Sequence, residues 1–171
     1  MKIFTRLFLG AAVLLGICSC QVAPNVHEKI VLQKQAPSSR DSAQLAYEVA
    51  RQTWCSNDDA CSLVLLLVDG EDRYLSFEDR RVALHVKGLA QVDWDLRADE
   101  PVTKGTMSYM VCRALGMKGG IMMQILPSRR YAYREAVYHG LMKQGSEYEP
   151  LTGPEAVGVL GRAGRFPSRG S

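Results

Sequence analysis

Five cysteines occur in the 171-residue sequence, and two of them are spaced closely enough to react with each other. Cys55 and Cys61 flank the polar stretch Ser-Asn-Asp-Asp-Ala, which we expect to form a turn between two helices. In an oxidising compartment this spacing predicts a local disulfide, and a pair of reduced thiols is the alternative. A disulfide that closes so short a loop would stabilise the fold by roughly 2 kcal/mol.

The usual signatures of catalysis and of metal or cofactor binding do not occur in the sequence. There is no Gly-x-Ser-x-Gly, His-Glu-x-x-His or phosphate-loop pattern, and no histidine lies at ligand spacing from a cysteine pair. Paired carboxylates such as Asp58-Asp59 lie in expected turns and indicate solvated charge rather than a glycosidase pair. We therefore expect no enzyme, with no catalytic residue, no metal site and no cofactor.

Trp94 is the best single candidate for binding. It lies between Asp93 and Asp95, in an expected loop before Pro101. An aromatic face with neighbouring carboxylates is a common composition for sugar contacts, because the ring stacks while the carboxylates accept hydrogen bonds from hydroxyls. The alternative is that Trp94 fills the edge of a helical bundle.

A second candidate is the run that begins at Arg129-Arg130 and includes Tyr131 and Tyr133. Guanidinium groups donate paired hydrogen bonds to carboxylates and phosphates, and tyrosine rings stack. This composition suits an acidic glycan or a protein partner. Solvated charge beside core tyrosines is the alternative.

The elements that must position these side chains are expected to be helices. Leu45, Val49 and Trp54 share a helical spacing after Asp41, and the apolar run at residues 63–68 favours a buried helix over a strand. Ser76 followed by Asp79 is typical of a helix start.

The chain also contains an internal repeat with an offset of 49 residues. Pro101-Val102-Thr103 matches Pro150-Leu151-Thr152, and Arg113-Ala114 matches Arg162-Ala163. Each Thr suits a helix N-cap, and Gly88-Leu89 and Gly140-Leu141 each suit the end of the preceding helix. The repeated unit is therefore a helix, a glycine stop, a loop, a Pro-apolar-Thr cap and a second helix.

This unit resembles the S-layer homology (SLH) domain, whose first helix ends in Gly-Ile or Gly-Leu before a Thr-Arg-Ala-Glu cap. Phe77-x-Asp79 is similar to the family's opening Phe-x-Asp. The resemblance implies an all-α bundle over residues 41–171, built from two repeats, at about residues 76–116 and 130–163, or from three if residues 41–70 form another. Lys104 and Gly153 replace the family's ligand-contacting Arg. The candidate glycan-binding residues are Trp94, Lys104 and Asp79.

The N-terminus has the layout of a secretory signal: Lys2 and Arg6 precede an apolar run at residues 7–17. The sequence Ile17-Cys18-Ser19-Cys20 that follows resembles the lipobox of bacterial lipoproteins. The resemblance implies a signal peptide at residues 1–19 and a membrane anchor through lipid on Cys20, with more than one acyl chain. An ordinary cleaved signal with incidental cysteines is the alternative. Gln21, where an Asp would favour inner-membrane retention, indicates the outer membrane in a host with two membranes.

Removing Lys2 and Arg6 leaves 21 − 2 = 19 basic residues against 18 acidic ones, so nucleic acid is not an expected partner. Residues 20–40 contain Pro24, Pro37 and Ser38-Ser39 and are interpreted as the lipidated N-terminus and a flexible tether. The leading hypothesis is an exported, lipid-anchored, non-catalytic protein that links a membrane to cell-wall or envelope polysaccharide. The alternative is an adaptor that contacts another envelope protein and binds no glycan.

Overall fold

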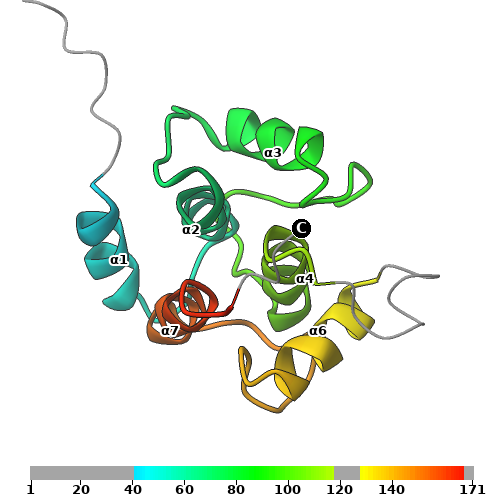
Figure 1. Cartoon of the computed structure of the whole chain (residues 1–171). Helices are drawn as coiled ribbons and strands as arrows, with labels where there is room; N and C mark the ends of the chain where they lie inside the picture. The colour runs from blue at the N-terminus through cyan, green and yellow to red at the C-terminus, as the bar shows by residue number, and fades with distance from the viewer. Residues whose placement is uncertain (1–40, 118–127, 168–171) are drawn as a thin grey trace, which may run out of the picture. The chain divides into compact units, whose positions relative to one another are not determined.

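The computed structural model describes residues 41–117 and 128–167. The predicted signal peptide, the predicted acylation site Cys20 and the predicted tether lie outside these residues. The described part contains six α-helices and no strand (Figure 1): α1 Ser42–Ala50, α2 Asn57–Asp69, α3 Phe77–Val86, α4 Lys104–Ala114, α6 Arg129–Tyr138 and α7 Gly153–Ala163. The all-α prediction is therefore confirmed.

Each of these helices begins at a side chain that accepts a hydrogen bond from a free N–H group of the first turn. The N-caps predicted at Ser76, Thr103 and Thr152 are confirmed. The Thr152 cap is reinforced by Glu155, which completes a capping box. The N-caps of the six described helices are Asp41, Ser56, Ser76, Thr103, Ser128 and Thr152.

The glycine stops of the two predicted repeats are also confirmed. Gly88 and Gly140 both have φ of 69°, a left-handed conformation that strains any residue with a Cβ. The next residue in each case donates a hydrogen bond back into the helix, from Leu89 to Leu84 and from Leu141 to Ala136, both at 2.8 Å. These bonds satisfy carbonyl groups that the helix end leaves without a partner.

The first helix is shorter than the spacing of Leu45, Val49 and Trp54 predicted. It ends at Ala50, and Trp54 lies beyond it in an exposed position. Only Leu45 and Val49 of this set are buried, because Trp54 belongs to the bend that follows α1 and precedes α2.

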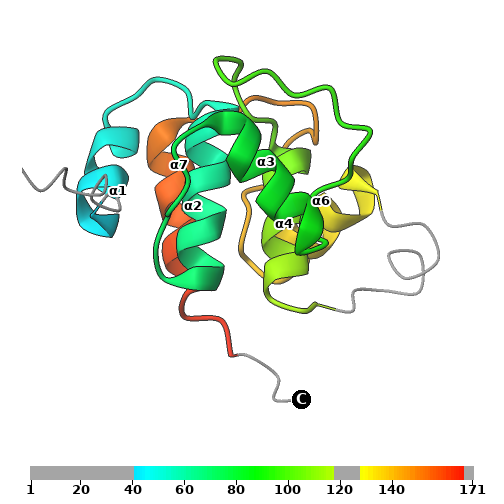
Figure 2. The same ribbon diagram turned by 90° about the horizontal axis from the view of Figure 1, so that it is seen from above.

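Three inner helices, α2, α4 and α7, are covered by three outer ones (Figures 1 and 2). The outer helix α3 packs mainly against α2, α6 against α4, and α1 against α7. No outer helix packs mainly against the inner helix that follows it in the chain. The contact between α1 and α7 therefore joins the first and last described helices.

A ring of backbone hydrogen bonds joins the starts of the three inner helices. Val102 donates to Cys55 at 2.8 Å, Leu151 donates to Val102 at 2.9 Å, and Cys55 donates to Leu151 at 2.9 Å. We call these three residues the cap ring. Each directly precedes an N-cap, and each is fully buried. Cys55-Ser56 thus occupies the same place as the two predicted Val102-Thr103 and Leu151-Thr152 caps.

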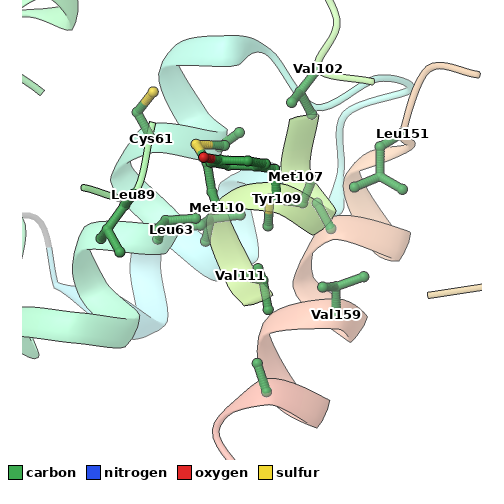
Figure 3. Packing of buried hydrophobic residues seen from close by; sticks show 14 of the residues in the cluster. Cys61, Leu63, Leu89, Val102, Met107, Tyr109, Met110, Val111, Leu151 and Val159 are labelled. Carbon is green, nitrogen blue, oxygen red and sulfur yellow. The ribbon is translucent and has the colours of Figure 1, made fainter. Parts of the chain in front are cut away.

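Below the cap ring, apolar side chains of the inner helices form the core (Figure 3). Leu63 from α2, Met107, Met110 and Val111 from α4, and Val159 from α7 are buried there with the ring residues Val102 and Leu151. Burial of such side chains is the main favourable term in folding. The core therefore holds the three helix starts together and fixes the loops that surround them.

Candidate functional site

Lys104 is the first residue of α4, and its side chain is already engaged. It is only 5% exposed, and its Nζ lies 2.8 Å from Oε2 of Glu149. The hydrogen bond with Glu149 raises the pKa of Lys104 and lowers that of Glu149. A cation at a helix N-terminus is opposed by the helix dipole, so the Glu149 carboxylate offsets an unfavourable position. A ligand at Lys104 would have to displace Glu149.

Trp94 is a core residue at the edge of the bundle, which is the alternative that its sequence context left open. It is 4% exposed, and its ring meets Tyr109 edge-on with centroids 5.1 Å apart. The guanidinium of Arg129 lies over the ring at 4.9 Å from its centroid, and the indole N–H donates to Gln91 at 2.9 Å. The face that a sugar would need is therefore covered by protein atoms.

Asp79 is exposed, but its hydrogen bonds serve the start of α3. Its backbone N–H donates to the Ser76 hydroxyl at 3.2 Å, and that hydroxyl donates to the Asp79 carboxylate at 2.6 Å. Asp79 lies on α3, which packs on α2, whereas Lys104 begins α4 and Trp94 packs against α4. These three sequence candidates do not form one open site.

The predicted disulfide is not formed in the structure, where Cys55 and Cys61 are free, buried thiols. Burial raises the pKa of each thiol to about 12, and nearby Asp59 and Asp58 add smaller effects at Cys55 and Cys61 respectively. Cys55 belongs to the cap ring and Cys61 lies inside α2, so the two thiols are held by different elements. The polar stretch between them is the first turn of α2 rather than an independent loop.

A cluster of polar and charged side chains lies on α6 and the loop after it. They surround a cleft of about 570 Å³, which we call the α6 cleft. Arg130 and Arg134 project from successive turns of the helix, and Tyr138 beside them is 82% exposed. The lining residues are Arg130, Tyr133, Arg134, Val137, Tyr138, Gln144, Gly145 and Glu147.

Packing of α6 on α4 decides which of its side chains reach the cleft. Ala132 and Ala136 are buried, and the hydroxyl of Tyr133 donates to the carbonyl of Lys143 at 3.1 Å. Arg130 and Arg134 are exposed and have no carboxylate or hydrogen-bond partner within residues 41–117 and 128–167. Both guanidinium groups are therefore available to an external anion.

The opposite rim of the α6 cleft is held in place by backbone contacts. The N–H of Gly105 donates to the carbonyl of Glu147 at 2.9 Å. A Cβ at Gly105 would lie 2.9 Å from that carbonyl oxygen, so only glycine allows this approach without a shift. The loop that carries Gln144 and Glu147 is thus fixed against the start of α4.

Part of this site could be found in the sequence, and part could not. Arg130 and Tyr133 fall in the Arg-Tyr run identified above, whereas Arg129 in the same run covers Trp94 and donates to Thr106 at 3.3 Å. Arg134 and Tyr138 were missed. The available signal was the four-residue spacing from Arg130 through Arg134 to Tyr138, which places all three on one side of a helix.

No known protein family, curated protein or solved structure matches the chain. Among the described residues, no helix is long and apolar enough to cross a membrane. The same residues contain no group of three or more His, Cys, Asp or Glu side chains that could hold a metal ion. The α6 cleft and the N-terminal sequence are therefore the features of the chain that bear on its function.

Proposed function

We propose that this protein is a non-catalytic envelope lipoprotein that binds anionic envelope polysaccharide in the α6 cleft. The single observation that carries the binding proposal is the pair of exposed guanidinium groups, Arg130 and Arg134, which have no partner among the described residues. The lipobox-like sequence before Cys20 supports attachment of the chain to a membrane. The protein would then link a membrane to a charged polymer.

The spacing of the two arginines suits a polymer with repeated negative groups. Residues four apart on a helix lie about 6 Å apart along its axis, so one ligand segment can reach both guanidinium forks. Arginine donates two parallel hydrogen bonds to a carboxylate or phosphate oxygen pair, which gives orientation as well as attraction.

The other lining groups suit the uncharged parts of a sugar. Gln144 and Glu147 offer acceptors to hydroxyl groups, and Gln144 also donates. The exposed ring of Tyr138 provides a flat apolar surface beside the two cations. A cleft with two cations, an acid rim and an aromatic ring thus matches a hydroxyl-rich anion better than a bare inorganic one.

A protein partner is the second candidate for the same surface. Tyr and Arg dominate the energetics of many protein interfaces, and Tyr148, next to the cleft residue Glu147, is exposed like Tyr138. The engagement of Lys104 by Glu149 and the burial of Trp94 also remove two of the predicted glycan contacts. An adaptor that binds no glycan would use the α6 cleft as the centre of its interface with another protein.

Cosedimentation distinguishes these functions. The full chain in a mild detergent is mixed with purified cell-wall sacculi that carry their attached polymers, and the pelleted fraction is measured at increasing salt. Polysaccharide binding predicts retention that weakens with salt, because the contacts are between exposed charges. Arg130→Ala and Arg134→Ala should each weaken binding about tenfold, since a hydrogen bond to a charged group contributes about 1.5–3 kcal/mol.

Arg73→Ala and Arg97→Ala are the matched controls, because both arginines are exposed and lie outside the α6 cleft. They remove the same charge and should leave retention unchanged. Protein that stays in the supernatant at low salt would favour the adaptor function. For the anchor, mass spectrometry of the mature N-terminus should find acyl chains on Cys20, and any other first residue would contradict it.

A further inference from the structure

The α6 cleft contains an acid as well as two bases, and the acid also lacks a partner. Glu147 lines the cleft from the loop, whereas Arg130 and Arg134 line it from α6. The Glu147 carboxylate forms no ion pair or hydrogen bond with any residue in the ranges 41–117 and 128–167. Glu147 is partly buried, unlike the two exposed arginines. A partly buried carboxylate has lost some of its hydration, so a cation that reaches it is favoured.

The acid and the two bases do not neutralise each other. The loop after α6 turns back beside that helix (Figure 1), yet Glu147 forms no ion pair with Arg130 or Arg134. The two arginines are also four residues apart on one helix, a spacing at which like charges repel. The cleft therefore presents two unsatisfied positive charges on one side and one unsatisfied negative charge on the other.

Backbone hydrogen bonds hold the loop in this position. The N–H of Gly105 donates to the carbonyl of Glu147, and the N–H of Lys104 donates to the carbonyl of Glu149, both at 2.9 Å. At the other end of the loop, the Tyr133 hydroxyl donates to a backbone carbonyl at 3.1 Å. The start of α4 thus fixes the backbone of Glu147, and the loop cannot move as a whole to close on the arginines.

We propose that the ligand of the α6 cleft is zwitterionic: an anionic polysaccharide that also carries free amino groups. Its phosphate or carboxylate pairs with Arg130 and Arg134, and a nearby ammonium group of the ligand pairs with Glu147. This inference rests on the proposed function and narrows its ligand class. A polymer with negative groups alone would leave Glu147 unpaired and add a like charge beside it, which opposes binding.

The aromatic lining of the cleft also suits an ammonium group. The ring of Tyr138 is 82% exposed and lies in the same cleft. A cation is attracted to the face of an aromatic ring, and an alkyl ammonium also offers apolar carbon atoms to it. Tyr138 therefore favours the same part of the ligand as Glu147 does.

Two small probes test the pairing directly, because 2-aminoethyl phosphate and ethyl phosphate differ only in the ammonium group. At about pH 8 both phosphates are dianions and the amine is protonated. The full chain in mild detergent is titrated with each probe by NMR. The unchanged chain should bind 2-aminoethyl phosphate about two- to fivefold more tightly, the range for an exposed ion pair. Glu147→Gln, which keeps the side-chain shape, should bind both probes equally.

Glu78→Gln is the matched control, because Glu78 is exposed and lies outside the cleft. It should keep the preference for the amine, whereas Arg130→Ala should weaken both probes alike. Circular dichroism verifies that the variants fold. Equal affinities in the unchanged chain, or a preference that persists in Glu147→Gln, would overturn the zwitterionic ligand and leave the anion site standing. Failure of both probes to bind would overturn the anion site of the proposed function as well.

Chemical treatment of the sacculi extends the test to the polymer. Acetic anhydride neutralises all free amines, and it should reduce retention of the unchanged chain to that of Glu147→Gln. Mild alkali removes only ester-linked amino acids, so loss of retention after alkali assigns the amine to these esters. Loss after acetic anhydride alone assigns it to amino sugars. Salt-sensitive retention that neither treatment changes would contradict the zwitterionic ligand while still supporting polysaccharide binding.

Discussion

The Nζ atom of Lys104 lies 2.8 Å from Oε2 of Glu149, so one ion pair joins the start of α4 to the loop that leads into α7. The same two residues are also joined through the backbone, because the N–H of Lys104 donates to the Glu149 carbonyl at 2.9 Å. The equivalent bond at the start of α2 runs from Asn57 to Glu100. Lys104 therefore acts in the structure as a connector between helices.

The Lys104–Glu149 pair should make stability depend on pH. The pKa of Glu149 is below its ordinary 4.5 and that of Lys104 is above its ordinary 10.5, in each case chiefly through their mutual hydrogen bond. The contribution is therefore lost as pH falls through the folded-state pKa of Glu149, and again as pH rises through that of Lys104. Glu149→Gln should lower Tm between about pH 5 and pH 10, and the difference from the unchanged protein should close in acid. A difference that stays constant down to acid pH would show that charge is not its cause.

Gly153 and Gly161 of α7 should respond in opposite directions to alanine. A Cβ at Gly153 would collide with the carbonyl of Val49 and lie 2.7 Å from that of Gln52, whereas a Cβ at Gly161 meets nothing within 4 Å. Gly153→Ala should lower the free energy of unfolding by about 1–3 kcal/mol through overpacking. Gly161→Ala should stabilise it by about 0.4–1 kcal/mol, because alanine loses less backbone entropy in a helix. Urea unfolding of both variants measures the contrast, and equal effects would contradict the packing of α1 on α7.

Arg80 should be the most costly charged residue to remove. It is buried, and its guanidinium contacts Asp72 at 2.6 Å, Asp58 at 2.8 Å and the carbonyl of Tyr74 at 2.8 Å. Arg80→Ala leaves the buried Asp72 without a counterion and should cost about 3–5 kcal/mol in the free energy of unfolding. Arg81→Ala is the control on the same helix and should cost less than about 1 kcal/mol, since its pair with Glu78 is exposed. Similar losses in the two variants would contradict the buried cluster.

The three buried cysteines should be unreactive in the folded protein. Burial is the main reason that the pKa values of Cys55, Cys61 and Cys112 are each about 12. At pH 8 only about one thiol in ten thousand is then a thiolate, which is the reactive form. A maleimide should label none of the three until denaturant is added. Labelling after denaturation, with and without reductant, also tests the disulfide: two additional labels after reduction would show that Cys55 and Cys61 had been joined.

The helix termini were the part of the fold that the sequence specified most directly. The caps at Thr103 and Thr152 and the stops at Gly88 and Gly140 depend on side chains and backbone angles within a few residues. Such local hydrogen bonds leave a recognisable spacing, so these helix starts and stops could be predicted. The third cap, Ser56, was not identified, because the preceding Cys55 resembles neither Val102 nor Leu151 in type and no proline precedes it.

The tertiary structure alone decided which side chains remain available for binding. Lys104 and Trp94 looked available in the sequence, yet Glu149 engages one and Arg129 covers the other. Both partners lie more than thirty residues away along the chain, so no local pattern could reveal them. The exposure of Arg130 and Arg134 also depends on a contact between segments that are distant in the sequence. The buried alanines of α6 lie on the helix that packs against α4, and this tertiary contact leaves the two arginines exposed to solvent.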